Sequence, residues 1–319
     1  MPGACTTIAA ALRWAYSRLS AAGCDTPTLD AEVILAHTLR CDRAWLYTHP
    51  EHRLTEPQIQ SFVTLVTRRC AHEPVAYLVG HKEFFGLDFL ITPAVLVPRP
   101  ETELLVEIAL EHATDRSKAL WVADVGTGSG VLAVALAVHL PRARIVATDI
   151  SAPALAVARH NAQCHGVDRR IMFLQTDLLL TVPIPFDIVL ANPPYLRRNA
   201  LPTLANVVAP DKPGPGSPVC RSKRERDSSG ADSGTTLSLA WEPQIALDGG
   251  VEGLYVIRRL LAMMPSRLRP GGLFAMELGA AQAHVVLELA HTSFPHATIT
   301  LRRDYAGLER VLIVVAAKN

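Results

Sequence analysis

The chain has 319 residues, which is room for one large or two modest domains, and 49% of them are hydrophobic, which is ample for a core. Its 31 basic and 30 acidic residues give a net charge of +1. This balance excludes a strong overall field that would attract nucleic acid and leaves only a local basic patch open.

The cysteines and the hydrophobic runs indicate in which cellular compartment the protein is expected. The six cysteines form no Cys-x-x-Cys pair, which argues against a zinc site or a disulfide framework and suits a reducing compartment. Arg13 interrupts the first apolar stretch, so no signal peptide is expected. The longest apolar run, 131–140, is too short to span a bilayer. We therefore expect a soluble, cytoplasmic protein with no membrane contact and no metal.

The first 75 residues are predicted to be a small helical domain. Its expected helices run from Thr6 or Thr7 to Leu19, from near Asp30 to Leu39, over 44–47, and onward from a capping box at 55–58. This region contains no glycine-rich loop and no acidic cluster. The pattern leaves two roles open, a surface for protein contact and a structural cap.

Residues 76–103 are predicted to form a hairpin and a linker. The hydrophobic period changes at Gly80, and the stretches 81–85 and 87–91, joined at Gly86, are typical of a β-hairpin.

The stretch 97–103, Val-Pro-Arg-Pro-Glu-Thr-Glu, predicts a rigid turn that leads into a helix ending near Leu110. Glu101 and Glu103 fall in the first turn of this helix, where the helix dipole favours acids. A sharper hypothesis places Arg99 and Glu101 at the rim of an active site, because the two prolines hold the segment stiff.

From residue 104 onward, strands and helices alternate. The expected strands are 119–125, 144–149, 171–175, 186–191, 272–278, 297–301 and 311–316, and the expected helices are 131–140, 153–164 and 254–268. This βαβ repetition predicts an α/β fold with a parallel sheet covered by helices on both faces.

One segment, from about 206 to 238, breaks this alternation. It combines a Pro/Gly-rich stretch at 213–218 with a basic stretch at 221–226 and has almost nothing to bury. Such a composition predicts a disordered insertion within the second domain. A basic finger for nucleic acid is the alternative.

Four residues, Asn192-Pro193-Pro194-Tyr195, follow the buried strand 186–191 directly. Two prolines cannot donate to a sheet ladder, so the strand must stop and leave carbonyl groups free. The Asn192 oxygen and the Pro193 carbonyl can accept from a planar NH2 group, against which Tyr195 can lie flat. We interpret this as a pocket for a planar amide or amino group, and a simple strand-ending turn with a buried tyrosine is the alternative.

A second candidate site is the turn after strand 119–125, which contains Gly126, Thr127, Gly128, Ser129 and Gly130. Its glycines let a backbone turn pass close to a ligand, and Asp149, at the end of the next strand, can accept from a ribose. Asp177 follows the third strand, where an acid can accept from an adenine amino group. The alternating glycines do not match the usual dinucleotide fingerprint. With Asn192 one strand later, this order resembles that of S-adenosylmethionine-dependent methyltransferases of the seven-stranded class.

The resemblance becomes closer over most of the chain. The stretches 73–80, 83–86, 97–103, 124–130, 192–195, 241–243 and 304–310 are similar to the release-factor glutamine methyltransferases of the HemK type. Two departures stand out. The segment 206–238 is longer than the family's loop, and Leu178 stands where an aromatic residue often flanks the adenine.

This resemblance implies a fold and a reaction. The fold would be a seven-stranded, Rossmann-like class I methyltransferase sheet (104–319), a hairpin linker (76–103) and a helical substrate-recognition domain (1–75). The enzyme would methylate the glutamine amide nitrogen of the Gly-Gly-Gln motif in class 1 peptide-chain release factors, which modulates translation termination. It would act as a monomer without binding nucleic acid directly.

The resemblance also implies residue roles. The residues that hold S-adenosylmethionine would be Gly126, Thr127, Gly128, Ser129, Gly130, Asp149, Asp177, Leu178 and Asn192. The catalytic residues would be Asn192, Pro193 and Tyr195, and Pro194, Arg99 and Glu101 would join them in contacting the substrate.

Four other functions stay open at this stage. A ribosomal-protein glutamine, or an exocyclic amine of adenine or guanine in nucleic acid, would suit the same tetrad, although no aromatic-basic array is evident. A non-catalytic cofactor-binding partner is disfavoured by the intact tetrad. A nicotinamide oxidoreductase is disfavoured by the tetrad and by the glycine spacing.

Overall fold

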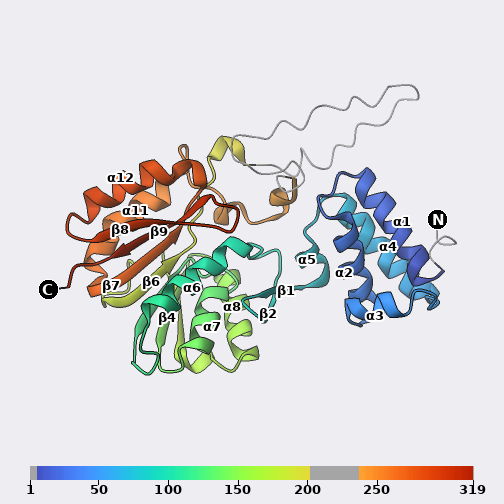
Figure 1. The fold of residues 1–319 in the computed structure, drawn as a ribbon, viewed down its shortest axis with the longest axis horizontal. Coiled ribbons are helices and arrows are strands. Elements are labelled where there is room, and N and C mark those ends of the chain that lie inside the picture. The colour runs from blue at the N-terminus through green and yellow to red at the C-terminus, as the bar shows by residue number, and fades with distance from the viewer. Residues whose placement is uncertain (1–5, 202–236, 319) are drawn as a thin grey trace. The chain divides into compact units, whose positions relative to one another are not determined.

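A computed structural model of the protein describes residues 6–201 and 237–318. The described residues form two compact units, 6–80 with 237–241, and 81–201 with 242–318 (Figure 1). The predicted disordered insertion at 206–238 lies outside the described residues apart from its last two.

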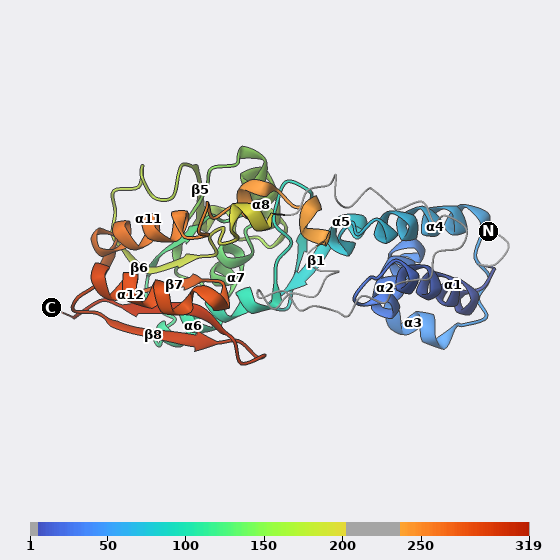
Figure 2. The ribbon, with the colours of Figure 1, turned by 90° about the horizontal axis from the view of Figure 1, so that it is seen from above.

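The first unit is a helical bundle (Figure 2). Its helices are α1 (Ile8–Ala21), α2 (Pro27–Leu39), α3 (Arg43–Thr48), α4 (Glu56–Cys70) and α5 (Val75–Val79). The Thr7 hydroxyl accepts from the Ala10 N–H at 3.3 Å and caps α1, so the predicted start is confirmed. The side-chain oxygen of Gln58 accepts from the Thr55 N–H at 2.8 Å, as one half of a capping box requires.

A buried ion pair joins two helices of this bundle. Arg69 on α4 donates through Nε to the Asp30 carboxylate on α2 at 2.7 Å, and their side chains are 9% and 6% exposed. Thr26 donates a further hydrogen bond to Asp30 at 2.8 Å. Both charges are therefore compensated, which a buried pair requires.

The predicted hairpin is present at the start of the second unit. Strands β1 (His81–Phe84) and β2 (Leu87–Leu90) pair antiparallel, and Phe85 and Gly86 form the turn with positive φ angles of 52° and 73°. After it, the 3-10 turn η2 (Pro100–Thr102) leads into α6 (Glu103–His112). The Phe85 N–H donates to the Glu103 carboxylate at 2.9 Å and ties the hairpin turn to the start of this helix.

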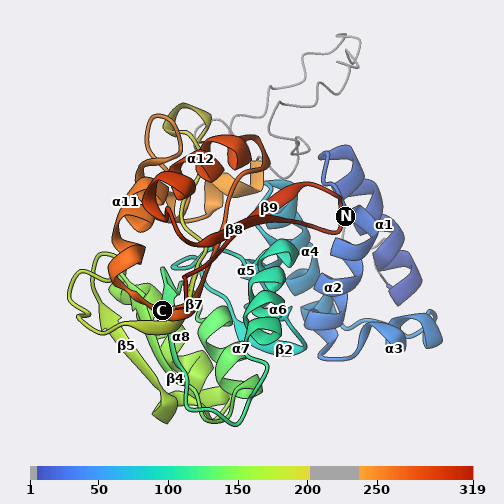
Figure 3. The same cartoon turned by 60° about the vertical axis from the view of Figure 1, so that its left-hand side comes forward.

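The core of the second unit is one seven-stranded sheet with the order β5-β4-β3-β6-β7-β9-β8. Its strands are β3 (Trp121–Val125), β4 (Arg144–Asp149), β5 (Ile171–Gln175), β6 (Phe186–Ala191), β7 (Leu268–Glu277), β8 (Thr298–Arg303) and β9 (Glu309–Val315). The first five are parallel and the last two form an antiparallel hairpin, which is visible in Figure 3. The predicted α/β fold with a seven-stranded sheet is confirmed.

Helices cover both faces of this sheet. On one side lie α6, α7 (Val131–His139) and α8 (Ala152–Cys164), and on the other lie α11 (Tyr255–Met263) and α12 (Ala283–Ser293) (Figure 1). The central strands are mostly apolar because both of their faces are buried, and Asp124 on β3 is a buried exception. The predicted helix end at Leu268 was wrong, because Pro265 ends the regular helix before it.

Candidate active site

The carboxyl ends of the parallel strands surround a cavity of about 350 Å³ in the second unit. Such a volume is within the range of small-molecule sites. The predicted residues that line it are Gly126, Thr127, Gly128, Ser129, Asp149, Asp177, Leu178, Asn192, Pro193 and Pro194. Four separate strand ends thus bring the two candidate sites of the sequence into one cavity.

Asp149 fixes the glycine turn from the neighbouring strand. Its Oδ2 accepts from the Gly128 N–H at 2.9 Å, and its Oδ1 accepts from the Ser151 N–H at 2.8 Å. Each carboxylate oxygen can accept a second hydrogen bond. Asp149 therefore shapes the turn and still offers acceptors to a ligand.

Gly130 does not line the cavity. A Cβ atom at this position would lie 3.0 Å from the Cβ of Ala158 on α8, and its φ angle is +83°. The third glycine of the turn therefore allows close packing against a helix and a left-handed backbone, while its predicted contact with the cofactor stays a prediction.

Asp124, on strand β3, holds the same glycine turn through hydrogen bonds. It is fully buried, and its Oδ2 accepts from the Thr127 hydroxyl at 2.6 Å and from the Ala133 N–H at 3.1 Å. Burial raises the pKa of this carboxyl to about 6. Its role is to join the turn to the first turn of α7.

Asp177 is paired with a residue that the sequence reasoning missed. Its Oδ2 accepts from Arg259 Nη2 on α11 at 2.7 Å, and the guanidinium lies 5.4 Å from the ring centroid of Tyr255. Among the described residues, nothing donates to the other oxygen, Oδ1, which remains for a ligand. Next to it, Leu178 lines the cavity with a positive φ angle of 54°, an uncommon conformation for a residue other than glycine.

Asn192 presents one side of its amide to the protein. Its Nδ2 donates to the hydroxyl oxygen of Thr102 at 3.0 Å. Within the described part of the chain, no group donates to Asn192 Oδ1 or to the Pro193 carbonyl. The end of β6 therefore offers two unused acceptors next to the glycine turn, and they suit a ligand NH2 group.

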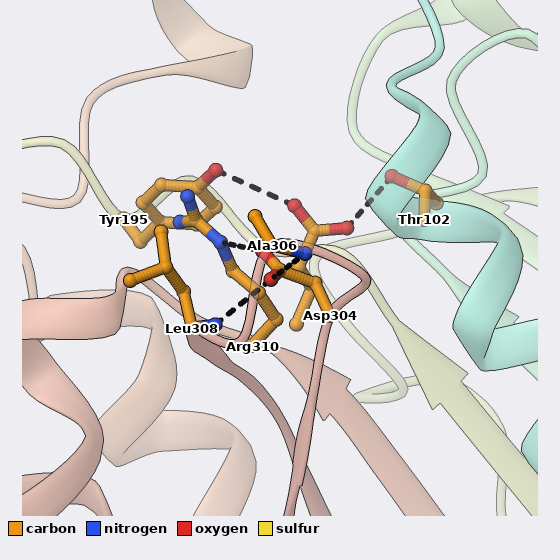
Figure 4. Close-up of polar contacts among 7 residues, drawn as sticks. Thr102, Tyr195, Asp304, Ala306, Leu308 and Arg310 are labelled. Carbon is orange, nitrogen blue, oxygen red and sulfur yellow. Dashed lines mark hydrogen bonds and ion pairs between the residues drawn. The ribbon is translucent and has the colours of Figure 1, made fainter. Parts of the chain in front are cut away.

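Tyr195 does not line the cavity, and its side chain contacts Glu277 instead. Its hydroxyl donates to Glu277 Oε1 at 3.4 Å, and Figure 4 shows Tyr195 and Thr102 on opposite sides of the carboxylate that both contact. Burial, with repulsion from the Glu277 carboxylate, raises the pKa of the Tyr195 phenol, so it remains a donor. Its predicted stacking on a substrate amide stays a prediction.

Arg99 and Glu101 are absent from the cavity lining, whereas Pro98 and Thr102 of the same segment belong to it. The Arg99 guanidinium is paired with Glu242, a buried carboxylate that also accepts from the Val97 N–H at 2.9 Å. The Arg99 cation offsets the free-energy cost of burying this carboxylate. The rim role expected for Arg99 and Glu101 stays a prediction, and the observed contact of Arg99 is this ion pair.

Two glycines let the loop 248–253 lie against the tetrad. A Cβ atom at Gly249 would be 2.8 Å from the Pro194 carbonyl oxygen, and one at Gly253 would be 2.4 Å from the Tyr195 carbonyl oxygen. The Gln282 side chain donates to the same Tyr195 oxygen at 3.0 Å and to the Gly253 carbonyl at 3.1 Å. The loop 248–253 and Gln282 therefore hold the backbone of the tetrad in place, and we call this contact the clamp.

Gly253→Ala is expected to lower both stability and turnover. A methyl group would overlap the Tyr195 carbonyl, and the φ angle of +74° is unfavourable for alanine. The overlap is expected to cost about 1–3 kcal/mol, because it forces backbone to move in a packed region. Thermal unfolding and kcat measure the two effects. Gly23→Ala is the matched control, since its φ angle is similar (+76°) and no atom lies within 4 Å of its added Cβ. Equal effects of the two substitutions would contradict the clamp.

The sequence reasoning missed Thr102, Glu277, Gln282 and Arg259. Two of them left a signal. Thr102 lies in the stiff 97–103 stretch, and Glu277 is a lone acid at the end of the apolar strand β7, where a buried charge needs a reason. In the residues that the structure describes, no group of three His, Cys, Asp or Glu side chains could hold a metal, and no helix could cross a membrane.

Two family models and two nearly full-length relatives are similar to this chain. Residues 10–80 match the family described as PrmC N-terminal domain, and residues 100–208 match the methyltransferase small domain. The release factor glutamine methyltransferase of Moorella thermoacetica is 38% identical over 308 residues, covering 96% of this chain and 98% of that protein. The protein of the same name from Koribacter versatilis is 36% identical over 312 residues, with coverages of 96% and 98%.

A solved structure shares the fold. The hMettl16 catalytic domain in complex with MAT2A 3′UTR hairpin 1 is 17% identical, with a TM-score of 0.50 over 86% of this chain and 87% of that one.

Proposed function

This chain belongs to the release factor glutamine methyltransferase family, and we propose that it methylates the glutamine of the Gly-Gly-Gln motif in class 1 peptide-chain release factors. The acceptor atom is the side-chain amide nitrogen, and the methylated factor acts in translation termination. The two unused acceptors at the end of β6, Asn192 Oδ1 and the Pro193 carbonyl, carry this proposal, because they fit a planar NH2 donor.

The cofactor that suits the cavity is S-adenosylmethionine, whose sulfonium supplies an electrophilic methyl group when bound. The donors and acceptors present fit it. Asp149 has acceptor capacity for ribose hydroxyls, Asp177 Oδ1 suits an adenine amino group, and the turn 126–129 allows close backbone approach. Leu178 completes the apolar wall beside Asp177.

The chain's own residues would activate a poor nucleophile. A glutamine amide nitrogen shares its lone pair with the carbonyl group. Two hydrogen bonds, from the substrate NH2 to Asn192 Oδ1 and to the Pro193 carbonyl, would hold the nitrogen in line with the methyl group. They would also stabilise the positive charge that develops on it. The extra proton can leave after transfer, so no general base among the lining residues is required.

The helical unit would contact a second part of the release factor. It matches the PrmC N-terminal domain over residues 10–80 and has no glycine turn of the kind seen at 126–130. We expect the enzyme to act as a monomer in the cytoplasm, where release factors work, without binding nucleic acid directly.

The direct test is incubation of the protein with labelled S-adenosylmethionine and a purified class 1 release factor, followed by peptide mass mapping. The expected result is one methyl group on the glutamine of Gly-Gly-Gln, and none on a factor carrying asparagine there. Methylation of a ribosomal-protein glutamine, or of adenine or guanine in nucleic acid, with no label on the release factor would overturn the assignment.

A further inference from the structure

Three side chains form a hydrogen-bonded series that ends at the catalytic amide. Asn192 Nδ2 donates to Thr102 Oγ1 at 3.0 Å, and Thr102 Oγ1 donates to Glu277 Oε2 at 2.7 Å. An ionised carboxylate can only accept, and a hydroxyl has one proton. The Thr102 proton is therefore committed to Glu277, and Thr102 can only accept from Asn192.

The Thr102–Glu277 end of this series is closed to water. Thr102 is 3% exposed and Glu277 is 2% exposed, so solvent does not supply other partners. The Tyr195 hydroxyl donates to the second oxygen of Glu277, so each carboxylate oxygen accepts a hydrogen bond from a fixed hydroxyl (Figure 4). The direction of every hydrogen bond in the series is thus set by the charge of Glu277.

We propose that Thr102 and Glu277 are positioning residues that hold the Asn192 amide with its oxygen toward the substrate nitrogen. The inference rests on the proposed function, since it concerns how the substrate NH2 group is received. A reversed amide would bring its own NH2 group against that of the substrate. Two donors would then face each other, and the nitrogen would lose one of its two acceptors.

The protonation state of Glu277 would control this orientation. Burial raises the pKa of Glu277 to about 6, and the Glu101 carboxylate on η2 adds to the shift. Opposing it are the hydrogen bonds from Thr102 and Tyr195 and the charge of Arg310 on β9, which is paired with Asp304. Below this pH, a protonated Glu277 can donate to Thr102, whose hydroxyl is then free to donate to Asn192 Oδ1.

The first test compares two substitutions of Thr102. Thr102→Val keeps the shape but removes the hydroxyl, and it is expected to lower kcat about 100-fold, as a misplaced reactive group does. KM for the release factor and Kd for S-adenosylmethionine should change much less than kcat. Thr102→Ser keeps the hydroxyl and should restore most of kcat. Wild-type kcat in the valine variant, or equal losses in both variants, would overturn the proposal.

The second test is the pH profile. Wild-type kcat should fall on the acid side with an inflection near pH 6, because a proton on Glu277 reverses the series. Glu277→Gln has a similar shape but cannot titrate, so its kcat should lack this inflection. An acid limb of unchanged position in Glu277→Gln would assign the titration to another group and overturn the proposal.

The third test needs no release factor, so it separates failure of this inference from failure of the proposed function. In the free protein labelled with ¹⁵N-asparagine, the Asn192 NH2 signal is assigned by its loss in Asn192→Ala. It should shift with an inflection near pH 6 in the wild type and not in Glu277→Gln. Absence of the inflection in the wild type would contradict the proposal, even if Thr102→Val fails to fold.

Discussion

Asn192→Ala is expected to lower kcat for methyl transfer by about 1,000-fold or more, while Kd for S-adenosylmethionine changes little. The substitution removes the Oδ1 acceptor and leaves the substrate nitrogen with the Pro193 carbonyl alone. Removal of one preorganised hydrogen-bonding group from a reacting centre costs roughly 100- to 1,000-fold, and here the same group also aligns the nucleophile. Single-turnover kinetics with saturating cofactor measure the effect on chemistry.

A matched variant sharpens this test. Asn192→Asp keeps the size and the acceptor oxygens but loses the donor that contacts Thr102, and it adds a charge on the other side of Thr102 from the Glu277 carboxylate. We expect it to retain more activity than alanine but less than the wild type. Turnover of Asn192→Ala at the wild-type rate would remove Asn192 from the mechanism.

Asp149→Ala is expected to raise Kd for S-adenosylmethionine by about 100-fold or more. The side chain holds the Gly128 and Ser151 N–H groups at 2.9 and 2.8 Å, and under the proposed function it would also accept hydrogen bonds from the ribose. A hydrogen bond to a charged group contributes about 1.5–3 kcal/mol. Loss of the two bonds that the ribose hydroxyls would donate to the carboxylate therefore corresponds to at least about a 100-fold rise in Kd. Isothermal titration calorimetry measures it, with thermal unfolding as the check on folding.

Asp177→Ala provides the comparison within the same cavity. The Asp177 side chain is 40% exposed and shares its charge with Arg259, so its contact with a ligand is more screened by solvent. The Kd of Asp177→Ala for S-adenosylmethionine should therefore rise less than the Kd of Asp149→Ala. A larger effect at Asp177, or none at Asp149, would contradict the assignment of Asp149 as the main ribose acceptor.

Local sequence patterns were sufficient for the strands, for most of the helices and for two halves of the site, but they did not predict α5 (Val75–Val79) or α12 (Ala283–Ser293). The apolar run 186–191 followed by two prolines had to end as a strand at Asn192, and the glycines after Val125 had to form a turn. Because parallel strands place their carboxyl ends at one edge, both stretches were expected together. Gly128 from the turn and Pro193 from the tetrad do line the same cavity.

The partner of each polar side chain was decided only by the tertiary structure. Thr102 and Glu277 are 175 positions apart in the sequence, yet one hydrogen bond joins them. Arg99, which the sequence placed at the rim of the site, forms an ion pair with the buried Glu242 carboxylate, 143 positions away, while its rim role stays a prediction. Arg259 reaches Asp177 from a helix on which no pattern marked it.

The sequence by itself determined where the backbone is straight, where it turns and which short motifs face the ligand edge of the sheet. These features depend on neighbours within a few residues, through hydrophobic period, proline and glycine. The orientation of the Asn192 amide was settled only by the folded chain. It depends on which donors and acceptors meet across the sheet and on the burial that removes water as an alternative partner.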